Sequence, residues 1–258
     1  MTVALVTGAG SGIGEASARR LAAGGAQVVV VDIDSERAER VAAEIDGLAV
    51  TADVADEGDV DRYMAAAVER YGRVDRHHLN AGIIGSFAPF SELSLAEFDD
   101  VIGVNLRGVF LGLRAAFRAY ERQDGGGAIA ITGSISGLRG SSDLIPYHVS
   151  KHGVVGLTRC AAITGGPLGV RVNAVAPGIV LTGLFAQSGS VTGGGSDAVQ
   201  RARNSALARP GEVEEIAALV AWLLSDEASF VTGEIVSIDG GATALNPVRP
   251  SGQPRQEG

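Results

Sequence analysis

Tyr147 and Lys151 are the residues whose types and spacing most clearly suggest acid–base chemistry. They lie four positions apart in the segment Tyr147-His148-Val149-Ser150-Lys151, and residues at that spacing share one face of a helix. A cation beside a phenol favours the phenolate, so we expect Lys151 to lower the pKa of Tyr147 from about 10. The pair would then act as a general acid or base near neutral pH, although a surface Tyr–Lys pair would have the same spacing.

Lys151 is also unusual in composition. Of the 21 basic residues, 20 are arginine and Lys151 is the only lysine. Arginine is a wide planar fork that stays protonated, whereas lysine is a compact ammonium with a tunable pKa. The single lysine therefore indicates a position where arginine does not serve, unless it is a chance surface residue.

Ser134 comes 13 residues before Tyr147, at the end of a predicted strand over 128–131. If that strand belongs to a parallel sheet, Ser134 and Tyr147 face the same mouth of the sheet. His148 and His152 flank the same helical segment, and we interpret both as structural.

A glycine-rich turn follows the first apolar run. Gly8, Gly12 and Gly14 have the spacing G-x-x-x-G-x-G within the segment from Thr7 to Gly14, which differs from G-x-G-x-x-G. Glycines let a backbone turn tightly and approach a pyrophosphate, and the N-terminus of the following helix offers free N–H groups. The position of this turn between a strand and a helix predicts nucleotide binding.

Two aspartates end the next two predicted strands. Asp32 lies 18 residues beyond Gly14 and is placed to accept hydrogen bonds from the adenosine ribose hydroxyls. Two like charges ~4 Å apart cost about 4 kcal/mol at an effective dielectric near 20, so Asp32 favours NAD over NADP. A helix-capping role is the alternative, which Asp34 or Ser35 could fill instead. Asp53 could accept from the adenine amine or be a turn residue.

The elements that must position these residues alternate between short apolar runs and amphipathic stretches. Repeated strand–helix alternation predicts an α/β fold with a single Rossmann-like doubly wound parallel sheet and helices on both faces. We expect one domain over 1–245, with a glycine-rich substrate lid at 183–208 and a Pro-rich tail at 246–258. Strands are predicted at 3–6, 27–31, 48–50, 74–79, 128–131, 170–175 and 234–238, and helices at 12–24, 35–45, 56–71, 95–121, 146–163 and 212–225.

Composition excludes several classes of protein. The chain has 258 residues with a formal net charge of −9, which disfavours nucleic acid and anionic membranes as partners. No apolar run reaches ~18 residues, so no membrane span is expected. Cys160 is the one cysteine and can form neither an intrachain disulfide nor a zinc site by itself. With no basic leader at its N-terminus, the chain is expected to be cytoplasmic. We also expect the protein to need no metal.

Together these motifs resemble the short-chain dehydrogenase/reductase family, in its type of about 250 residues. The resemblance runs from Thr2 to about Gly241. It rests on Thr7 to Gly14, Asp53-Val54, Asn80-Ala81-Gly82, Asn105, Ser134 with Gly137, Tyr147-x-x-x-Lys151, Arg171-Val172-Asn173, Pro177-Gly178 and Asp239-Gly240-Gly241.

The resemblance implies roles for single residues. Tyr147 would move the proton, and Ser134 would hold the substrate oxygen. Lys151 would bind the nicotinamide ribose and lower the Tyr147 pKa, while Asn105 would hold a relay water. The residues implied to bind NAD are Gly8, Ser11, Gly12, Ile13, Gly14, Asp32, Ile33, Asp53, Val54, Asn80, Ala81, Gly82, Tyr147, Lys151, Pro177, Gly178, Val180 and Thr182.

We therefore predict an NAD-dependent oxidoreductase that interconverts a secondary alcohol and a ketone by hydride transfer. An NADPH-dependent 3-ketoacyl reductase and a catalytically silent nucleotide-binding scaffold are the alternatives. The family also implies a homotetramer. The candidate pocket residues are mostly apolar and favour a small neutral, hydrophobic substrate: Ile84, Phe87, Ser136, Leu138, Leu144, Ile145, Leu184 and Phe185.

One segment departs from the family pattern. His77-His78-Leu79 stands where the family has an apolar strand before its N-A-G motif. Adjacent strand residues point to opposite faces of a sheet, so the two histidines are poorly placed to share a metal. We interpret them as packed strand residues.

Overall fold

A computed structural model describes residues 1–182, 202 and 205–245 of the chain. Most of the predicted lid, 183–201 and 203–204, lies outside the described residues, and so does the whole of the predicted tail, 246–258.

The described strands form one sheet of seven, all parallel, in the order β3-β2-β1-β4-β5-β6-β7. The chain builds outward from β1 to β3 and then crosses back to β4, so the direction of winding reverses between β1 and β4. In open parallel sheets ligands bind at this reversal, beyond the carboxyl ends of the strands. The strands are β1 Val3–Thr7, β2 Gln27–Asp32, β3 Leu48–Thr51, β4 Arg76–Leu79, β5 Gly127–Thr132, β6 Val170–Pro177 and β7 Ile235–Ile238.

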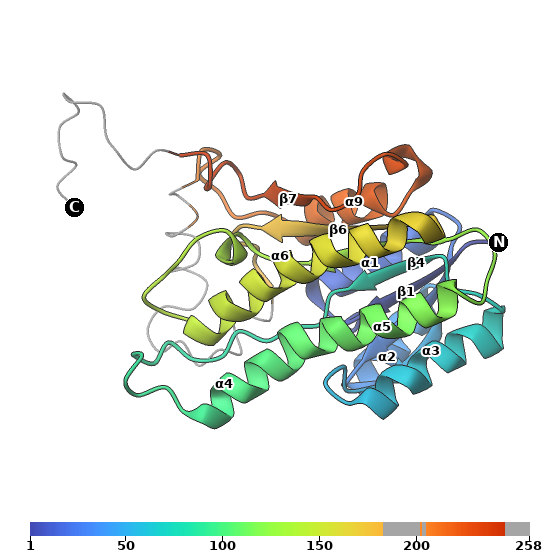
Figure 1. Ribbon diagram of the computed structural model, residues 1–258, viewed down its shortest axis with the longest axis horizontal. Coiled ribbons are helices and arrows are strands. Elements are labelled where there is room, and N and C mark those ends of the chain that lie inside the picture. The colour runs from blue at the N-terminus through green and yellow to red at the C-terminus, as the bar shows by residue number, and fades with distance from the viewer. Residues whose placement is uncertain (183–201, 203–204, 246–258) are drawn as a thin grey trace.

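Helices cover both faces of the sheet, so the predicted doubly wound fold is confirmed. The apolar residues of α1, α2 and α9 pack on one face, and those of α3, α5 and α6 pack on the other (Figure 1). The helices are α1 Gly12–Ala23, α2 Ser35–Glu44, α3 Glu57–Tyr71, α4 Leu95–Ile102, α5 Gly108–Tyr120, α6 Ile145–Gly165 and α9 Val213–Leu223. In the part of the chain that the structure describes, no helix is long and apolar enough to cross a membrane.

Strand composition explains this two-sided burial. Every residue of β1 is buried, as expected for a central parallel strand with helices on both faces. β4 differs from β1 because it carries two histidines, His77 and His78. Both are nevertheless fully buried. Burial lowers the pKa of each imidazole to about 3, so both rings are neutral. Among the described residues, no cluster of potential metal ligands forms, at β4 or elsewhere.

The helix predicted over 95–121 is interrupted. Gly103–Arg107 forms a π-helical turn between α4 and α5. Such a turn inserts one extra residue and is often found at functional sites. It changes the direction of the side chains that follow it, and it carries Asn105.

Candidate active site

A cleft of about 850 Å³ opens beyond the carboxyl ends of the strands, at the reversal of winding between β1 and β4. Of the residues predicted to bind the cofactor, all except Gly14 line this cleft. A Cβ atom on Gly14 would overlap the carbonyl oxygen of Gly8, so Gly14 lets the helix start lie directly beneath the loop. The lining members are Gly8, Ser11, Gly12, Ile13, Asp32, Ile33, Asp53, Val54, Asn80, Ala81, Gly82, Tyr147, Lys151, Pro177, Gly178, Val180 and Thr182.

The glycine-rich turn has the geometry of an anion cradle. Gly8 and Gly12 have φ angles of +62° and +56°, in the left-handed region that favours glycine. A Cβ on Gly8 would lie 2.8 Å from the Cα of Ala81. Within the described residues, no side chain caps α1, whereas Asp34, Asp56 and Ser94 cap α2, α3 and α4. The N–H groups that begin α1 are therefore left for a ligand, and a phosphate suits them.

Asp32 sits at the end of β2, beside the glycine-rich turn. Its Oδ2 accepts a hydrogen bond from the backbone N–H of Gly10 at 2.8 Å, and its Oδ1 accepts from the N–H of Asp34 at 3.0 Å. The alternative capping role belongs to Asp34, whose side chain accepts from the N–H of Arg37 at 3.1 Å. Asp32 thus has a fixed orientation and further lone pairs directed to the cleft.

Asp53 has the turn role that its position suggested and also lies at the cleft. Its Oδ1 accepts from the N–H of Ala55 at 2.8 Å, which stabilises the turn after β3, and the residue also lines the cleft. Val54 lies next to it on the wall and packs against Gly108 at the start of α5. The adenine role of Asp53 stays a prediction.

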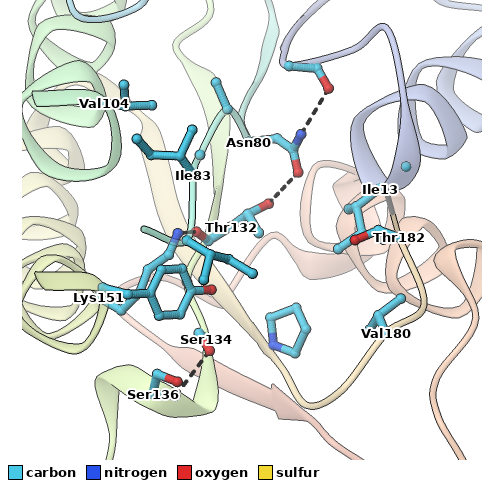
Figure 2. A pocket seen from close by; sticks show the side chains of 18 of the residues that line it. Ile13, Asn80, Ile83, Val104, Thr132, Ser134, Ser136, Lys151, Val180 and Thr182 are labelled. Carbon is cyan, nitrogen blue, oxygen red and sulfur yellow. Dashed lines mark hydrogen bonds between the residues drawn. The ribbon is translucent and has the colours of Figure 1, made fainter. Parts of the chain in front are cut away.

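Tyr147 and Lys151 share one face of α6, as their spacing predicted. The Lys151 Nζ atom lies 5.5 Å from the centroid of the Tyr147 ring and donates a hydrogen bond to the carbonyl oxygen of Thr132 at 2.8 Å (Figure 2). Lys151 is only 3% exposed, so its ammonium is nearly desolvated. It is therefore not a surface residue, and its compact head lies against the end of β5.

The expected lowering of the Tyr147 pKa is wrong for this structure. Burial raises the pKa of Tyr147 above its ordinary value, and a hydrogen bond with the Ser134 side chain only partly opposes that effect. Burial also lowers the pKa of Lys151 to about 8. The physical reason is the same for both groups, since a low-dielectric surrounding disfavours phenolate and ammonium alike. Spacing alone shows that two groups are close and leaves out what surrounds them.

Ser134 lies where the sequence placed it, just beyond β5 and facing Tyr147. Its Oγ accepts from the N–H of Ser136 at 3.0 Å and caps the short 3-10 turn Ile135–Gly137 (Figure 2). A Cβ on Gly137 would lie 2.5 Å from the carbonyl oxygen of Lys151, so this glycine lets the turn pack tightly on α6. The two elements that carry Ser134 and Tyr147 are thereby held in one arrangement.

Asn105 lies behind the cleft wall rather than in it. Its Oδ1 accepts from the N–H of Ile83 at 2.8 Å, and its Nδ2 donates to the Ile83 carbonyl at 2.8 Å and to Ser150 Oγ at 3.2 Å. The side chain thus ties the segment after β4 to α6. Its predicted role in holding a relay water stays a prediction, because both amide protons already bond protein atoms.

The substrate end of the cleft is more polar than the sequence suggested. Ile84, Phe87, Ser136 and Leu144 line it as predicted. Leu138 and Ile145 are absent from its wall, and Leu184 and Phe185 lie outside the described residues. Sequence reasoning missed several lining residues: Arg139, Ser141, Asp143 and His148, with Thr132, Ile83 and Val104 nearer the cofactor end. Only the position of Thr132, at the carboxyl end of a predicted strand, could have signalled its place.

Comparison with known proteins adds independent information. The family described as Enoyl-(Acyl carrier protein) reductase matches residues 8–243. The chain is 43% identical to a levodione reductase of Leifsonia aquatica over 252 residues, covering 94% of each chain. It is 40% identical to a cyclohexanol dehydrogenase of Acinetobacter sp. (strain SE19) over 247 residues, covering 94% of this chain and 95% of the relative.

The structure is also similar to solved structures of proteins of the same kind. The crystal structure of levodione reductase matches with a TM-score of 0.91 and 42% identity, covering 95% of this chain and 98% of that one. A 3-ketoacyl-(acyl-carrier-protein) reductase from Brucella melitensis, complexed with NADH, matches with a TM-score of 0.87 and 36% identity, covering 94% and 98%.

Proposed function

Because the chain belongs to the short-chain dehydrogenase/reductase family, we propose that Ser134, Tyr147 and Lys151 form its catalytic centre and that NAD(H) is its preferred cofactor. The enzyme is an oxidoreductase that acts on CH–OH groups and interconverts a secondary alcohol and a ketone. The observation that carries the proposal is the placement of these three side chains in one cleft with an uncapped helix start and Asp32.

The bound nicotinamide would supply the hydride acceptor or donor of the reaction. In alcohol oxidation, the Tyr147 phenolate takes the proton of the substrate hydroxyl. In ketone reduction, the Tyr147 hydroxyl donates a proton to the substrate oxygen. Ser134 Oγ holds the substrate oxygen beside Tyr147. Lys151 has three N–H donors, so it would keep its bond to the Thr132 carbonyl while it binds the ribose hydroxyls and holds a positive charge close to the phenol.

The remaining residues would bind and orient the cofactor. The N–H groups at the start of α1 hold the pyrophosphate, Asp32 and Ile33 flank the adenosine ribose, and Asp53 with Val54 contacts the adenine. Asn80, Ala81 and Gly82 form the wall behind the cofactor. Pro177, Gly178, Val180 and Thr182 would hold the nicotinamide end, and a Cβ on Gly12 would lie 3.4 Å from Thr182 Cγ2 there.

We propose a small cyclic secondary alcohol or ketone as the substrate. The support is the similarity to a cyclohexanol dehydrogenase and the apolar group Ile84, Phe87 and Leu144 in the cleft. A panel of cyclic and linear secondary alcohols and ketones, followed through the nicotinamide absorbance with NAD⁺ or NADH, tests this. Turnover of linear 3-ketoacyl thioesters with NADPH alone would favour the ketoacyl reductase instead, and no turnover with any of these would favour the silent scaffold.

NAD(H) is expected to bind at least about tenfold more tightly than NADP(H), because a 2′-phosphate would face the Asp32 carboxylate. The nearby cation of Arg37 offers the phosphate little compensation, since its Nε is paired with Asp34 at 2.9 Å. Asp32→Ala should narrow the preference, as measured by titration of both reduced cofactors. Asp32→Asn removes the negative charge but keeps the size of the side chain and one acceptor for the backbone N–H of Gly10 or Asp34. It therefore tests the effect of the charge alone. Equal affinity of the unmodified enzyme for both cofactors would contradict the proposed contact between Asp32 and the adenosine ribose.

We further propose that the enzyme is a homotetramer, as the family implies. Large apolar side chains on two neighbouring helices support pairing of subunits, since Phe110 on α5 is 48% exposed and Ile163 on α6 is 80% exposed. Light scattering under dilute native conditions should report about four times the 26.2 kDa chain mass. A mass of one chain would contradict both the tetramer and a dimer.

We also propose that residues 1–245 form one cofactor-binding and catalytic domain and that the protein is cytoplasmic. The single described sheet, with strands from Val3 to Ile238, supports the one domain. Cys160 is exposed and free, which suits the reducing cytoplasm.

A further inference from the structure

Two consecutive histidines on β4 have the same burial but different partners. His77 and His78 are both fully buried and neutral. Neither ring nitrogen of His77 has a hydrogen-bond partner among the described residues, and its ring packs edge-on to Tyr63 with centroids 6.1 Å apart. His78 faces the other side of the sheet, and its Nε2 lies 2.9 Å from the hydroxyl of Thr132.

The direction of the hydrogen bonds around Thr132 can be worked out. The Nδ2 of Asn80 donates to the carbonyls of Thr7 and Gly8, at 3.1 and 3.2 Å, so its Oδ1 is the acceptor that faces Thr132. The Thr132 hydroxyl therefore donates its single proton to that Oδ1, at 2.9 Å (Figure 2). The contact with His78 must then run the other way, from a protonated Nε2 to the Thr132 oxygen.

This chain of bonds ends on both halves of the proposed cofactor site. Through Asn80 it reaches the carbonyl of Gly8, in the turn proposed to hold the pyrophosphate. Through the backbone of Thr132 it reaches Lys151, whose Nζ donates to the Thr132 carbonyl at 2.8 Å. His78 is fully buried and is not among the residues that line the cleft.

We propose that His78 is a positioning residue for cofactor binding, which acts by donating its Nε2 proton to Thr132 and so fixing Thr132 and Asn80 between the glycine-rich turn and Lys151. The proposal rests on the cofactor site proposed above. The Nδ1 of His78 is buried and has no hydrogen-bond partner within the part of the chain that the structure describes, which carries a desolvation cost that an apolar residue in the same space would avoid. The imidazole is retained at that cost for its one directed proton.

Three variants isolate that proton. His78→Gln places an amide N–H near the position of Nε2, whereas His78→Asn is shorter and places its amide near Nδ1, and His78→Met fills the space with no donor. His77→Met is the matched control, because it removes an equally buried imidazole from the same strand without removing a hydrogen bond. The readouts are the dissociation constant of NADH by fluorescence titration and the thermal unfolding midpoint.

The expected result is a rise of about tenfold in the NADH dissociation constant for His78→Met and His78→Asn, with His78→Gln close to the unmodified enzyme. His77→Met should keep the NADH affinity even where it shifts the unfolding midpoint. Should His78→Met fail to fold, the comparison of Asn with Gln decides.

NADH affinity that is equal in the His78 Asn and Gln variants, or that falls as much in His77→Met as in His78→Met, would overturn the positioning role. Failure of the proposed function would give a different result. If the proposed cofactor site is wrong, the unmodified enzyme itself binds no NADH, and the positioning role of His78 is then wrong as well.

Discussion

Replacing Tyr147 by phenylalanine is expected to lower kcat/KM for alcohol oxidation by about 1,000-fold or more, equivalent to ~4 kcal/mol of transition-state stabilisation. The substitution keeps the ring that packs beside Lys151 and removes only the hydroxyl that moves the proton. Steady-state kinetics with a cyclic secondary alcohol and NAD⁺ measure the loss, and thermal unfolding checks the fold.

Tyr120→Phe is the matched control for this prediction. Tyr120 is buried, on α5, and its hydroxyl has no hydrogen-bond partner among the described residues. Removing that hydroxyl should leave kcat/KM unchanged. A loss of less than about tenfold in Tyr147→Phe would show that another group supplies the proton, because a positioned general acid or base contributes at least about 100-fold.

Lys151→Arg is expected to keep the fold and to lower kcat/KM by at least about 100-fold, close to 2.7 kcal/mol. The Lys151 ammonium occupies a closed site, 2.8 Å from the Thr132 carbonyl and 3.8 Å from the point where a Cβ on Gly82 would lie. A guanidinium is wider and cannot take that position without displacing Tyr147 or the ribose. Arg118→Lys, on the exposed face of α5, is the reverse exchange and should leave kcat/KM unchanged.

The pH dependence gives Lys151→Arg a second readout. Oxidation needs Tyr147 ionised and Lys151 protonated, and burial raises the pKa of Tyr147 while it lowers that of Lys151 to about 8. kcat/KM for NAD⁺ should therefore rise with pH and level off above about 8, where each gain in phenolate is offset by loss of the ammonium. Arginine stays protonated, so the residual activity of the variant should continue to rise above pH 8. Near-normal turnover in Lys151→Arg would make the single lysine an accident of composition.

Much of the fold was predictable because the inner strands of the sheet are buried on both faces. Apolar runs such as Val3–Thr7 have no polar alternation, which is typical of a central parallel strand. The same topology made most of the site predictable, since parallel strands bring their carboxyl ends to one edge of the sheet. Asp32 ends β2, Asn80 and Ser134 come just after β4 and β5, and all three line the cleft.

The features that escaped prediction depend on surroundings rather than on spacing. The π-helical turn at Gly103–Arg107 leaves a normal helical pattern in the sequence, and only the backbone of the folded chain reveals it. The raised pKa of Tyr147 comes from desolvation by the residues around it, which spacing in the sequence does not encode. Arg139 reaches the cleft through a loop whose path no periodicity encodes, and the Nδ1 of His148, on α6, lies within hydrogen-bond distance of the carbonyl oxygens of Ser136 and Arg139 in that region.

The glycine-rich turn has a consequence for the entropy of binding. Gly8 and Gly14 would each collide with neighbouring backbone if they carried a Cβ, so their missing side chains are replaced by close contacts rather than by empty space. A turn packed in this way has little conformational freedom left to lose. Its ordering took place when the chain folded, and a ligand that arrives at the cleft meets a cradle that is already set.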